Sequence, residues 1–82
     1  MEETRVAVLA IIIEDHEKAG EINSILHEHS EAVIGRMGIP YREKGLSIIS
    51  IALDAPQNVI NTLAGKIGRI EGVTAKTVCS QK

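Results

Sequence analysis

One arginine stands where the sequence is otherwise apolar. Arg36 lies inside the run Val33–Ile39, and the polar turn Pro40–Gly45 that follows adds Tyr41 and Arg42. A guanidinium in such a strand must reach solvent at an edge or pair with an acid or a bound anion. We therefore predict that Arg36, Tyr41 and Arg42 form a ligand- or partner-binding surface. The alternative for Arg36 is a solvated residue at a strand edge.

The glycines near this arginine favour a hairpin over a phosphate-binding loop. Gly35, Gly38 and Gly45 surround Arg36 and the turn. A P-loop or a dinucleotide fingerprint places its glycines between a strand and a following helix, whereas a second apolar run follows here. We expect a twisted hairpin, in which the glycines let another backbone or a ligand come close to the arginine.

The three histidines do not predict a metal site within one chain. His27 and His29 are two residues apart, and positions two apart on a helix do not face each other. His16 lies at the opposite end of the same expected helix. A site would need histidines from several subunits, so we predict solvated helix histidines and no resident metal or other cofactor.

No group of residues predicts an enzyme. Cys79 is the sole cysteine, which excludes an intramolecular disulfide and a cysteine-based metal cluster within one chain. Its neighbourhood offers one basic residue, Lys76, which favours a buried or inert thiol. Glu14 and Asp15 cluster before the first expected helix, where a cap explains Asp15 and solvation explains Glu14. We predict no catalytic residues.

The composition argues against nucleic acid and membrane. The chain carries 9 basic and 11 acidic residues, a formal net charge of −2, and Tyr41 is its single aromatic residue. Neither an excess of positive charge nor a series of stacking platforms is present for DNA or RNA. The apolar run Val6–Ile13 is far shorter than the ~20 residues of a membrane helix and follows no basic segment. We expect a cytoplasmic protein.

The pattern of apolar residues predicts an α+β, ferredoxin-like βαββαβ fold in a single domain spanning residues 1–82. Asp15 and Asp54 are expected to cap the two helices, and Gly68 to end the second. Right-handed crossovers place both helices on one face of a four-stranded antiparallel sheet. The expected strands are Thr4–Ile13, Ala32–Ile39, Leu46–Leu53 and Gly72–Cys79, with helices at His16–His29 and after Asp54.

The other sheet face predicts assembly. A sheet covered on one side should alternate apolar with polar residues, yet both faces of Val6–Ile13 and most of both faces of Leu46–Leu53 are apolar. Apolar residues make up 44% of the chain, and an uncovered face of this kind exceeds what soluble monomers usually expose. We predict a homo-oligomer, a dimer or tetramer, formed through the open sheet face, with Arg36 at the interface rim. The alternative is that central strands are simply apolar and the hairpin partly covers the face.

Two segments resemble a known family. "GRMGIPYREKGLSIISIALDAP" and "NTLAGKIGRIEGVTAKTV" are similar to the small bacterial family of iron-only hydrogenase system regulators, and the resemblance spans Glu3–Val78. It implies an ACT-like ferredoxin fold, related in shape to the C-terminal domain of the nickel-responsive regulator. It also implies self-association and a role in hydrogenase expression or maturation. The turn "IIIEDHEKAG" lacks the early glycine of amino-acid-binding ACT domains, and "HEH" with Cys79 does not reproduce the nickel ligands.

Residues and resemblance together predict a non-catalytic, homo-oligomeric regulatory module. With no segment suited to DNA binding, regulation would pass through a protein partner or a small effector. The alternative function is a small-ligand or metal sensor whose site forms between subunits from the histidines and Arg36.

Overall fold

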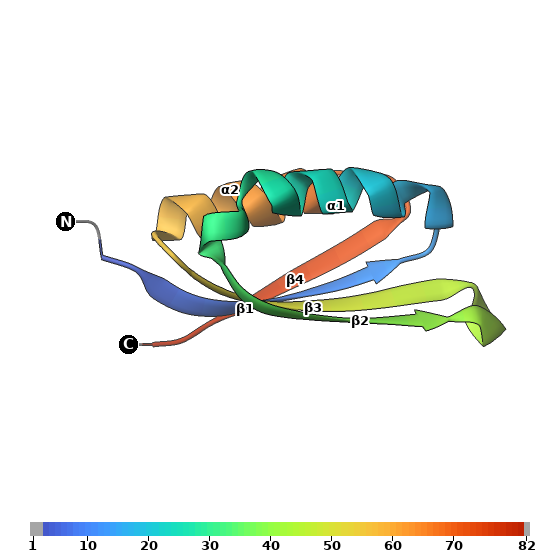
Figure 1. The fold of residues 1–82 in the computed structure, drawn as a ribbon, viewed down its shortest axis with the longest axis horizontal. Coiled ribbons are helices and arrows are strands. Elements are labelled where there is room, and N and C mark those ends of the chain that lie inside the picture. Colours follow the sequence, from blue (N-terminus) through green and yellow to red (C-terminus); the bar gives the residue numbers. More distant parts are fainter. Residues whose placement is uncertain (1–2, 82) are drawn as a thin grey trace.

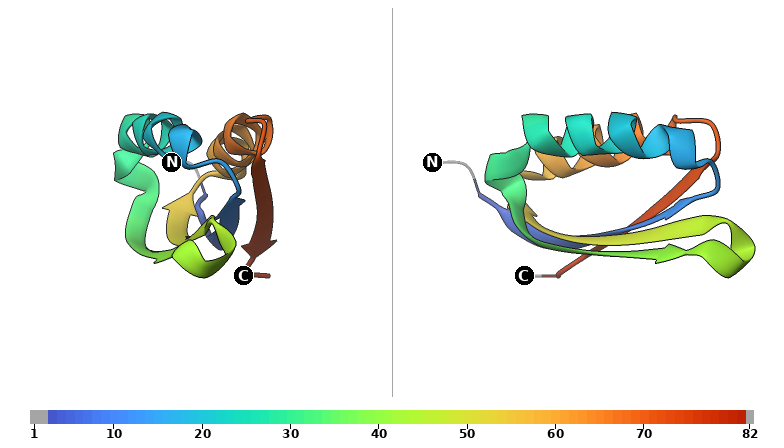
Figure 2. Two further views of the ribbon diagram at one scale, coloured as in Figure 1. Left: turned by 90° about the vertical axis from the view of Figure 1, so that its right-hand side faces the viewer. Right: turned by 45° about the vertical axis from the view of Figure 1, so that its right-hand side comes forward.

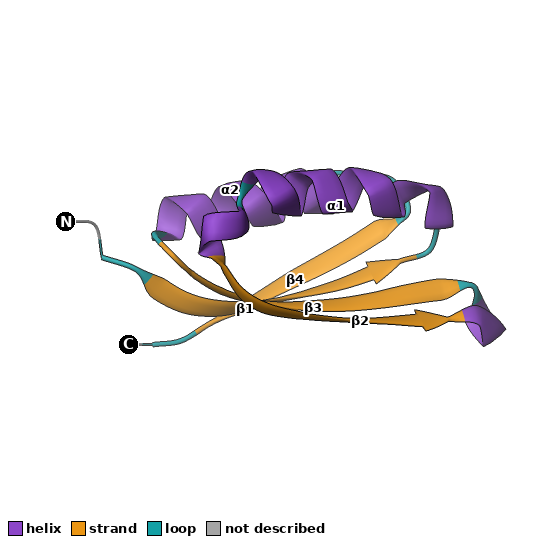
Figure 3. Cartoon of the chain, viewed as in Figure 1, coloured by secondary structure: helices purple, strands orange, loops and turns teal. Residues whose placement is uncertain are grey.

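The structure, a computed structural model, describes residues 3–81 and has the predicted α+β arrangement. Strand β1 is followed by helix α1, the hairpin β2–β3, helix α2 and strand β4 (Figure 1). Short 3₁₀ turns precede α1, follow it and close the hairpin (Figure 3). The elements are β1 Arg5–Ile13, α1 Ala19–Glu28, β2 Val33–Tyr41, β3 Leu46–Ala55, α2 Gln57–Gly68 and β4 Val73–Cys79.

The four strands form one antiparallel sheet in the order β2-β3-β1-β4. Both helices lie on the same side of this sheet, and the two views of Figure 2 show the opposite side without any covering element. The β2–β3 hairpin extends past the end of the helix layer (Figure 1). The predicted ferredoxin-like architecture, with two helices on one face, is therefore confirmed.

The core lies between the sheet and the helices. Alternate residues of the central strands β1 and β3 point to the helix side. There, buried residues of β1 lie opposite buried residues of β3, as Leu9 lies opposite Ile51. Both predicted helix stripes face them, with Ile22 and Leu26 buried on α1. The thirteen-membered core contains Ala7, Leu9, Ile11, Ile13, Ile22, Leu26, Ile49, Ile51, Leu53, Ala55, Ile60, Leu63 and Ile67.

The helix starts differ from each other. Asp15 begins the first helical segment as predicted, because its Oδ1 accepts a hydrogen bond from the Glu17 N–H at 3.0 Å; a 3₁₀ turn then leads into α1. The predicted cap Asp54 is wrong. Strand β3 continues to Ala55, which is buried and pairs with Arg5 of β1, so Asp54 remains in the strand and is exposed. Pro56 occupies the N-cap position of α2 and has no side-chain group that could cap this helix.

The hairpin is longer than the sequence indicated. Pro40 and Tyr41, expected in the turn, belong to β2 and pair with Ser47 and Leu46. Pro40 is tolerated because β2 is an edge strand, whose outward backbone groups need no ladder partner. The turn itself is the 3₁₀ segment Arg42–Lys44, and Gly45 closes it at φ 65°.

The open sheet face carries a patch of apolar side chains. β1 contributes Val8 and Ile12, and its neighbours contribute residues at matching register positions, such as Ile48 opposite Ile12. Small residues, among them Ala10, lie between these larger ones. The large exposed apolar residues at paired positions of this face are Val6, Val8, Ile12, Met37, Ile39, Tyr41, Ile48 and Val78, with exposed fractions from 38% to 69%.

The loop between α2 and β4 contains a glycine whose backbone conformation and close contact predict a loss of stability on substitution. Gly72 has φ 81°, its carbonyl accepts the Glu14 N–H at 2.7 Å, and an added Cβ would lie 3.2 Å from the Asp15 Cβ. Gly72→Ala should lower the free energy of unfolding by about 1–2 kcal/mol, through backbone strain and this contact.

Gly65→Ala is the matched control, because Gly65 lies inside α2 with open space around its Cα. That variant should raise the free energy of unfolding by about 0.5–1 kcal/mol. Urea denaturation followed by circular dichroism measures both. Equal stability of the two variants would contradict the strained turn.

Candidate functional site

Arg36 faces the helix layer, and a register shift in β2 puts it there. Val33 pairs with Leu53, Gly35 with Ala52 and Arg36 with Ile51, so one extra residue is accommodated between Val33 and Gly35. Regular alternation from Val33 would have turned Arg36 to the open face. Because of the bulge, Arg36 instead lies on the side of buried Ile51, away from the open face at whose rim we expected it.

The guanidinium reaches across to α1. Its Nη2 donates a hydrogen bond to Oδ1 of Asn23 at 3.0 Å. Within residues 3–81, no carboxylate lies within ion-pairing distance of Arg36; the recorded ion pair joins Lys66 and Glu28. The arginine therefore spans the opening between β2 and α1 with a neutral partner, and none of these residues forms an ion pair with it.

A groove of about 330 Å³ opens at this point. Asn23, His27 and Ser30 supply its polar wall from α1 and the turn that follows, and Arg36 supplies the opposite wall from β2. Its floor is apolar. The lining residues are Asn23, Leu26, His27, Ser30, Val33, Arg36 and Ile51.

Tyr41 and Arg42 lie elsewhere. Tyr41 pairs with Leu46 near the end of the hairpin, on the open side of the sheet, and its hydroxyl donates to a Glu43 carboxylate oxygen at 3.2 Å. Arg42 begins the 3₁₀ turn at the tip. Tyr41 lies five positions along the extended strand from Arg36, a distance of roughly 16 Å. The structure therefore divides the predicted surface into a groove residue and two tip residues.

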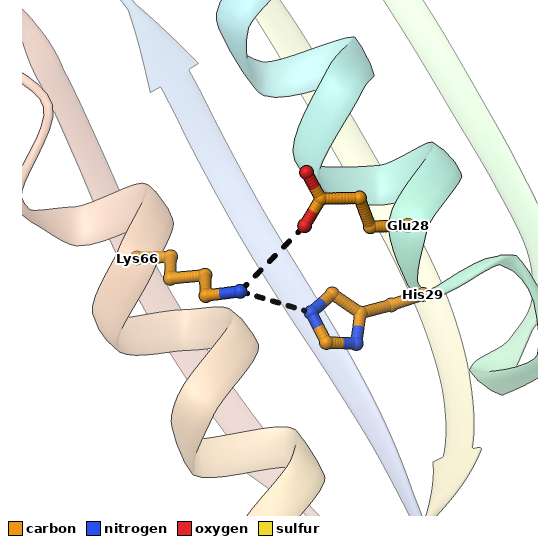
Figure 4. A network of polar contacts seen from close by, with 3 residues as sticks. All are labelled: Glu28, His29 and Lys66. Carbon is orange, nitrogen blue, oxygen red and sulfur yellow. Dashed lines mark hydrogen bonds and ion pairs between the residues drawn. The ribbon is translucent and has the colours of Figure 1, made fainter.

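The histidines are also separated. His16 precedes α1, while His27 and His29 lie at its C-terminal end, where His27 borders the groove. His29 approaches Lys66 of α2, with Nε2 3.5 Å from Nζ, and the same Nζ lies 3.7 Å from Oε2 of Glu28 (Figure 4). These exposed contacts join the two helices and contribute at most about 1 kcal/mol.

Residues 3–81 contain no group of three or more His, Cys, Asp or Glu side chains placed to hold a metal ion. Cys79, expected to be buried or inert, is a half-buried free thiol at the end of β4. A second groove of about 330 Å³ lies near the start of α2, and its lining includes Glu28, Glu31 and Asp54. The two grooves therefore differ in charge: this one is acidic, whereas the one beside Arg36 has no acidic residue in its lining.

Sequence reasoning missed the groove residues Asn23 and Ser30, and it considered His27 only with the other histidines as part of a site between subunits. Asn23, His27 and Ser30 follow one another at intervals of four and three residues, the spacing that places side chains along one stripe of a helix. This polar stripe runs beside the buried one that contains Leu26. The spacing was a usable signal, but nothing in it showed that Arg36 would face the stripe.

No helix in residues 3–81 is long and apolar enough to cross a membrane.

Comparisons with known proteins give one family and two informative structures. Residues 5–77 match the family model "TM1266-like: Iron-only hydrogenase system regulator, putative". The solved structure of the uncharacterized protein TM1266 from Thermotoga maritima is 41% identical, with a TM-score of 0.91, covering 96% of this chain and 100% of that one. The comparison with curated proteins finds no match.

A more distant structural match is to an enzyme. A formyltetrahydrofolate deformylase from Pseudomonas putida KT2440 gives a TM-score of 0.68 at 13% identity. The match covers 94% of this chain and 29% of the deformylase. At this identity the likeness shows the fold alone.

The contact between Arg36 and Asn23 predicts an energetic coupling between β2 and α1. A double-mutant cycle with Arg36→Ala and Asn23→Ala should give a coupling energy of about 0.5–1 kcal/mol, since an exposed hydrogen bond with one charged partner is lost in either variant. Chemical denaturation of the two single variants and the double variant measures it. The same cycle between Asn23 and Arg42 should give a coupling near zero. No coupling in the first cycle would contradict the contact between Arg36 and Asn23.

Proposed function

Because the chain belongs to the TM1266-like family of iron-only hydrogenase system regulators, we propose that it is a non-catalytic regulatory module that works as a homo-oligomer. Two or more copies associate through their open sheet faces. The observation that carries this proposal is the set of large apolar side chains exposed on the side of the sheet that no helix covers.

The size of that face supports association. Four strands about 4.8 Å apart, each seven or more residues long at about 3.3 Å per residue, present roughly 450 Å² before the relief of the side chains is counted. Because the face also carries polar residues such as Ser50 and Lys76, removing it from water on two copies is worth at most roughly 20 kcal/mol at about 25 cal/mol per Å² of apolar surface. This upper limit exceeds the estimated ~4–15 kcal/mol lost in translational and rotational freedom, and ordering of side chains reduces the surplus.

The charge distribution favours a partner of the same kind. Asp54 and Lys76 are the charged side chains at the paired positions of the open face, and Asp54 lies near one end of the sheet. The central positions Ala10, Ser50 and Ala52 are small, so the larger residues around them can interdigitate with those of a facing sheet. The open face of a second copy has the same small central residues and the same larger residues around them. In a C₂ dimer the same patch of each copy faces the other, so the larger residues of one face can pack against the small residues of the other.

The regulatory role is inferred from the family, and the protein would exert it by binding other molecules. The formal charge of −2 supplies no attraction for phosphate backbones. A module of this kind would influence hydrogenase expression or maturation by binding a protein partner or a small effector. The exposed hairpin tip, with Tyr41 and Arg42, is the surface proposed for a protein partner.

A second candidate function, a small-ligand sensor, is favoured by the groove at Arg36. The histidines and Arg36 were expected to build such a site between subunits. The groove instead draws Arg36 and His27 together within one chain, while His16 lies at the other end of the helix. The sensor would therefore be the same oligomeric module, with a ligand bound on the helix side of its sheet.

Assembly is tested by placing a charge in the open face. The wild-type protein should be a dimer or tetramer by size-exclusion chromatography with light scattering in physiological salt. Ile12→Lys should dissociate it, because the lysine would be buried unpaired between the sheets. Leu9 and Ile11 point into the core and would test folding instead.

Ser24→Lys on the exposed face of α1 adds the same charge away from the sheet and should leave the oligomer intact. Circular dichroism checks that both variants are folded. A wild-type protein that remains monomeric at high micromolar concentration would refute assembly through this face.

A further inference from the structure

We propose that the groove between α1 and β2 binds a small monocarboxylate with an apolar tail, held by Arg36, Asn23 and Ser30. The proposal deepens the second candidate function, the sensor, by naming its ligand class. It does not depend on assembly through the open face, which lies on the other side of the sheet.

The charge of the groove selects an anion. Arg36 is the permanent cation of the lining, and the lining contains no acidic residue. The neutral amide of Asn23 accepts one of the guanidinium hydrogen bonds but supplies no negative charge. A carboxylate that entered beside it would find the remaining N–H donors of Arg36 in the planar fork that suits a bidentate pair.

The hydrogen-bonding groups reinforce this choice. Since Oδ1 of Asn23 accepts from Arg36, the amide nitrogen of the same side chain is left as a donor. Ser30 adds a hydroxyl that can donate, and His27 adds a ring that can donate from one nitrogen. The polar wall is thus rich in donors around a single arginine, and one cation matches one negative charge better than it matches a phosphate dianion.

The floor defines the rest of the ligand. Val33 is the half-buried apolar residue of the lining, and the buried core residues Leu26 and Ile51 border the groove from below. The volume of about 330 Å³ lies at the lower end of the range of about 300–1,000 Å³ for small-molecule sites. An aliphatic tail of a few carbons would pack on this floor. With no acid in the lining to pair with an ammonium group, a simple acid is preferred over the corresponding amino acid.

The test uses hexanoate as a probe, followed by two-dimensional ¹H–¹⁵N NMR of the full chain. Hexanoate should shift the resonances of groove residues with a Kd of about 1 mM, a value typical of a well-placed ligand of this size. Hexanamide, which has the same shape without the charge, should bind at least about tenfold more weakly. 2-Aminohexanoate should also bind more weakly than hexanoate.

Variants separate the groove from the general surface. Arg36→Lys should weaken hexanoate binding about tenfold and Arg36→Ala by about 10–100-fold, because the fork and then the charge are lost. Asn23→Asp should also abolish binding, since a fixed carboxylate would occupy the guanidinium that the ligand needs. Arg69→Ala, which removes an equal charge at the C-terminal end of α2 and outside the groove lining, should bind as the wild type does.

Four results of these titrations decide whether the groove binds a carboxylate within one chain. No shift of the groove resonances at 20 mM hexanoate, or equal binding by the Arg36→Ala and Arg69→Ala variants, would overturn the proposal. Equal binding of hexanoate and hexanamide would do the same. The titration is repeated on the Ile12→Lys variant: unchanged affinity supports a site within one chain, whereas loss of binding in a folded Ile12→Lys protein overturns it and points to a site that needs the oligomer.

Discussion

The extra residue in β2 between Val33 and Gly35 decides which residues of this strand lie on each side of the sheet. Residues after the shift alternate in the opposite sense from residues before it, because the side-chain period of a strand is two. Arg36 consequently faces the helices, while Met37 and Ile39 face the open side. Without the shift, a charge would lie in the apolar face and two apolar side chains would lie over the opening beside α1.

That constraint depends on the pairing of β2 with β3. The register of β3 is fixed on its other edge by β1, where buried residues such as Leu9 and Ile51 lie opposite one another in the core. β2 is an edge strand, so it can absorb an additional residue without disturbing a second neighbour. The core therefore determines the register of the central strands, and the edge strand supplies the variation that forms the groove.

Most of the fold could be predicted from the sequence because its signals are local and strong. Dense β-branched runs marked the strands, the 3.6-residue periodicity marked the buried stripes of both helices, and Asp15 marked a true helix start. Asp54 led to a wrong prediction of a helix cap, because its residue type and position suit one. In the structure, the pairing of Ala55 with Arg5 extends the strand past Asp54. Such pairing is a non-local property that a single sequence does not display.

The candidate site was less predictable for the same reason. The sequence singled out Arg36 as unusual, but the face it would occupy depended on a bulge that has no distinct residue pattern beyond a nearby glycine. Asn23 acquires its significance only once Arg36 lies opposite it. The consequence reaches beyond this one contact: Arg36 and its neighbour Met37 project to opposite sides of the sheet, so a single strand contributes to both the groove and the open face. Part of the formyltetrahydrofolate deformylase has the same fold. The fold therefore does not by itself determine that one strand contributes to both surfaces; the register of the edge strand β2 determines it.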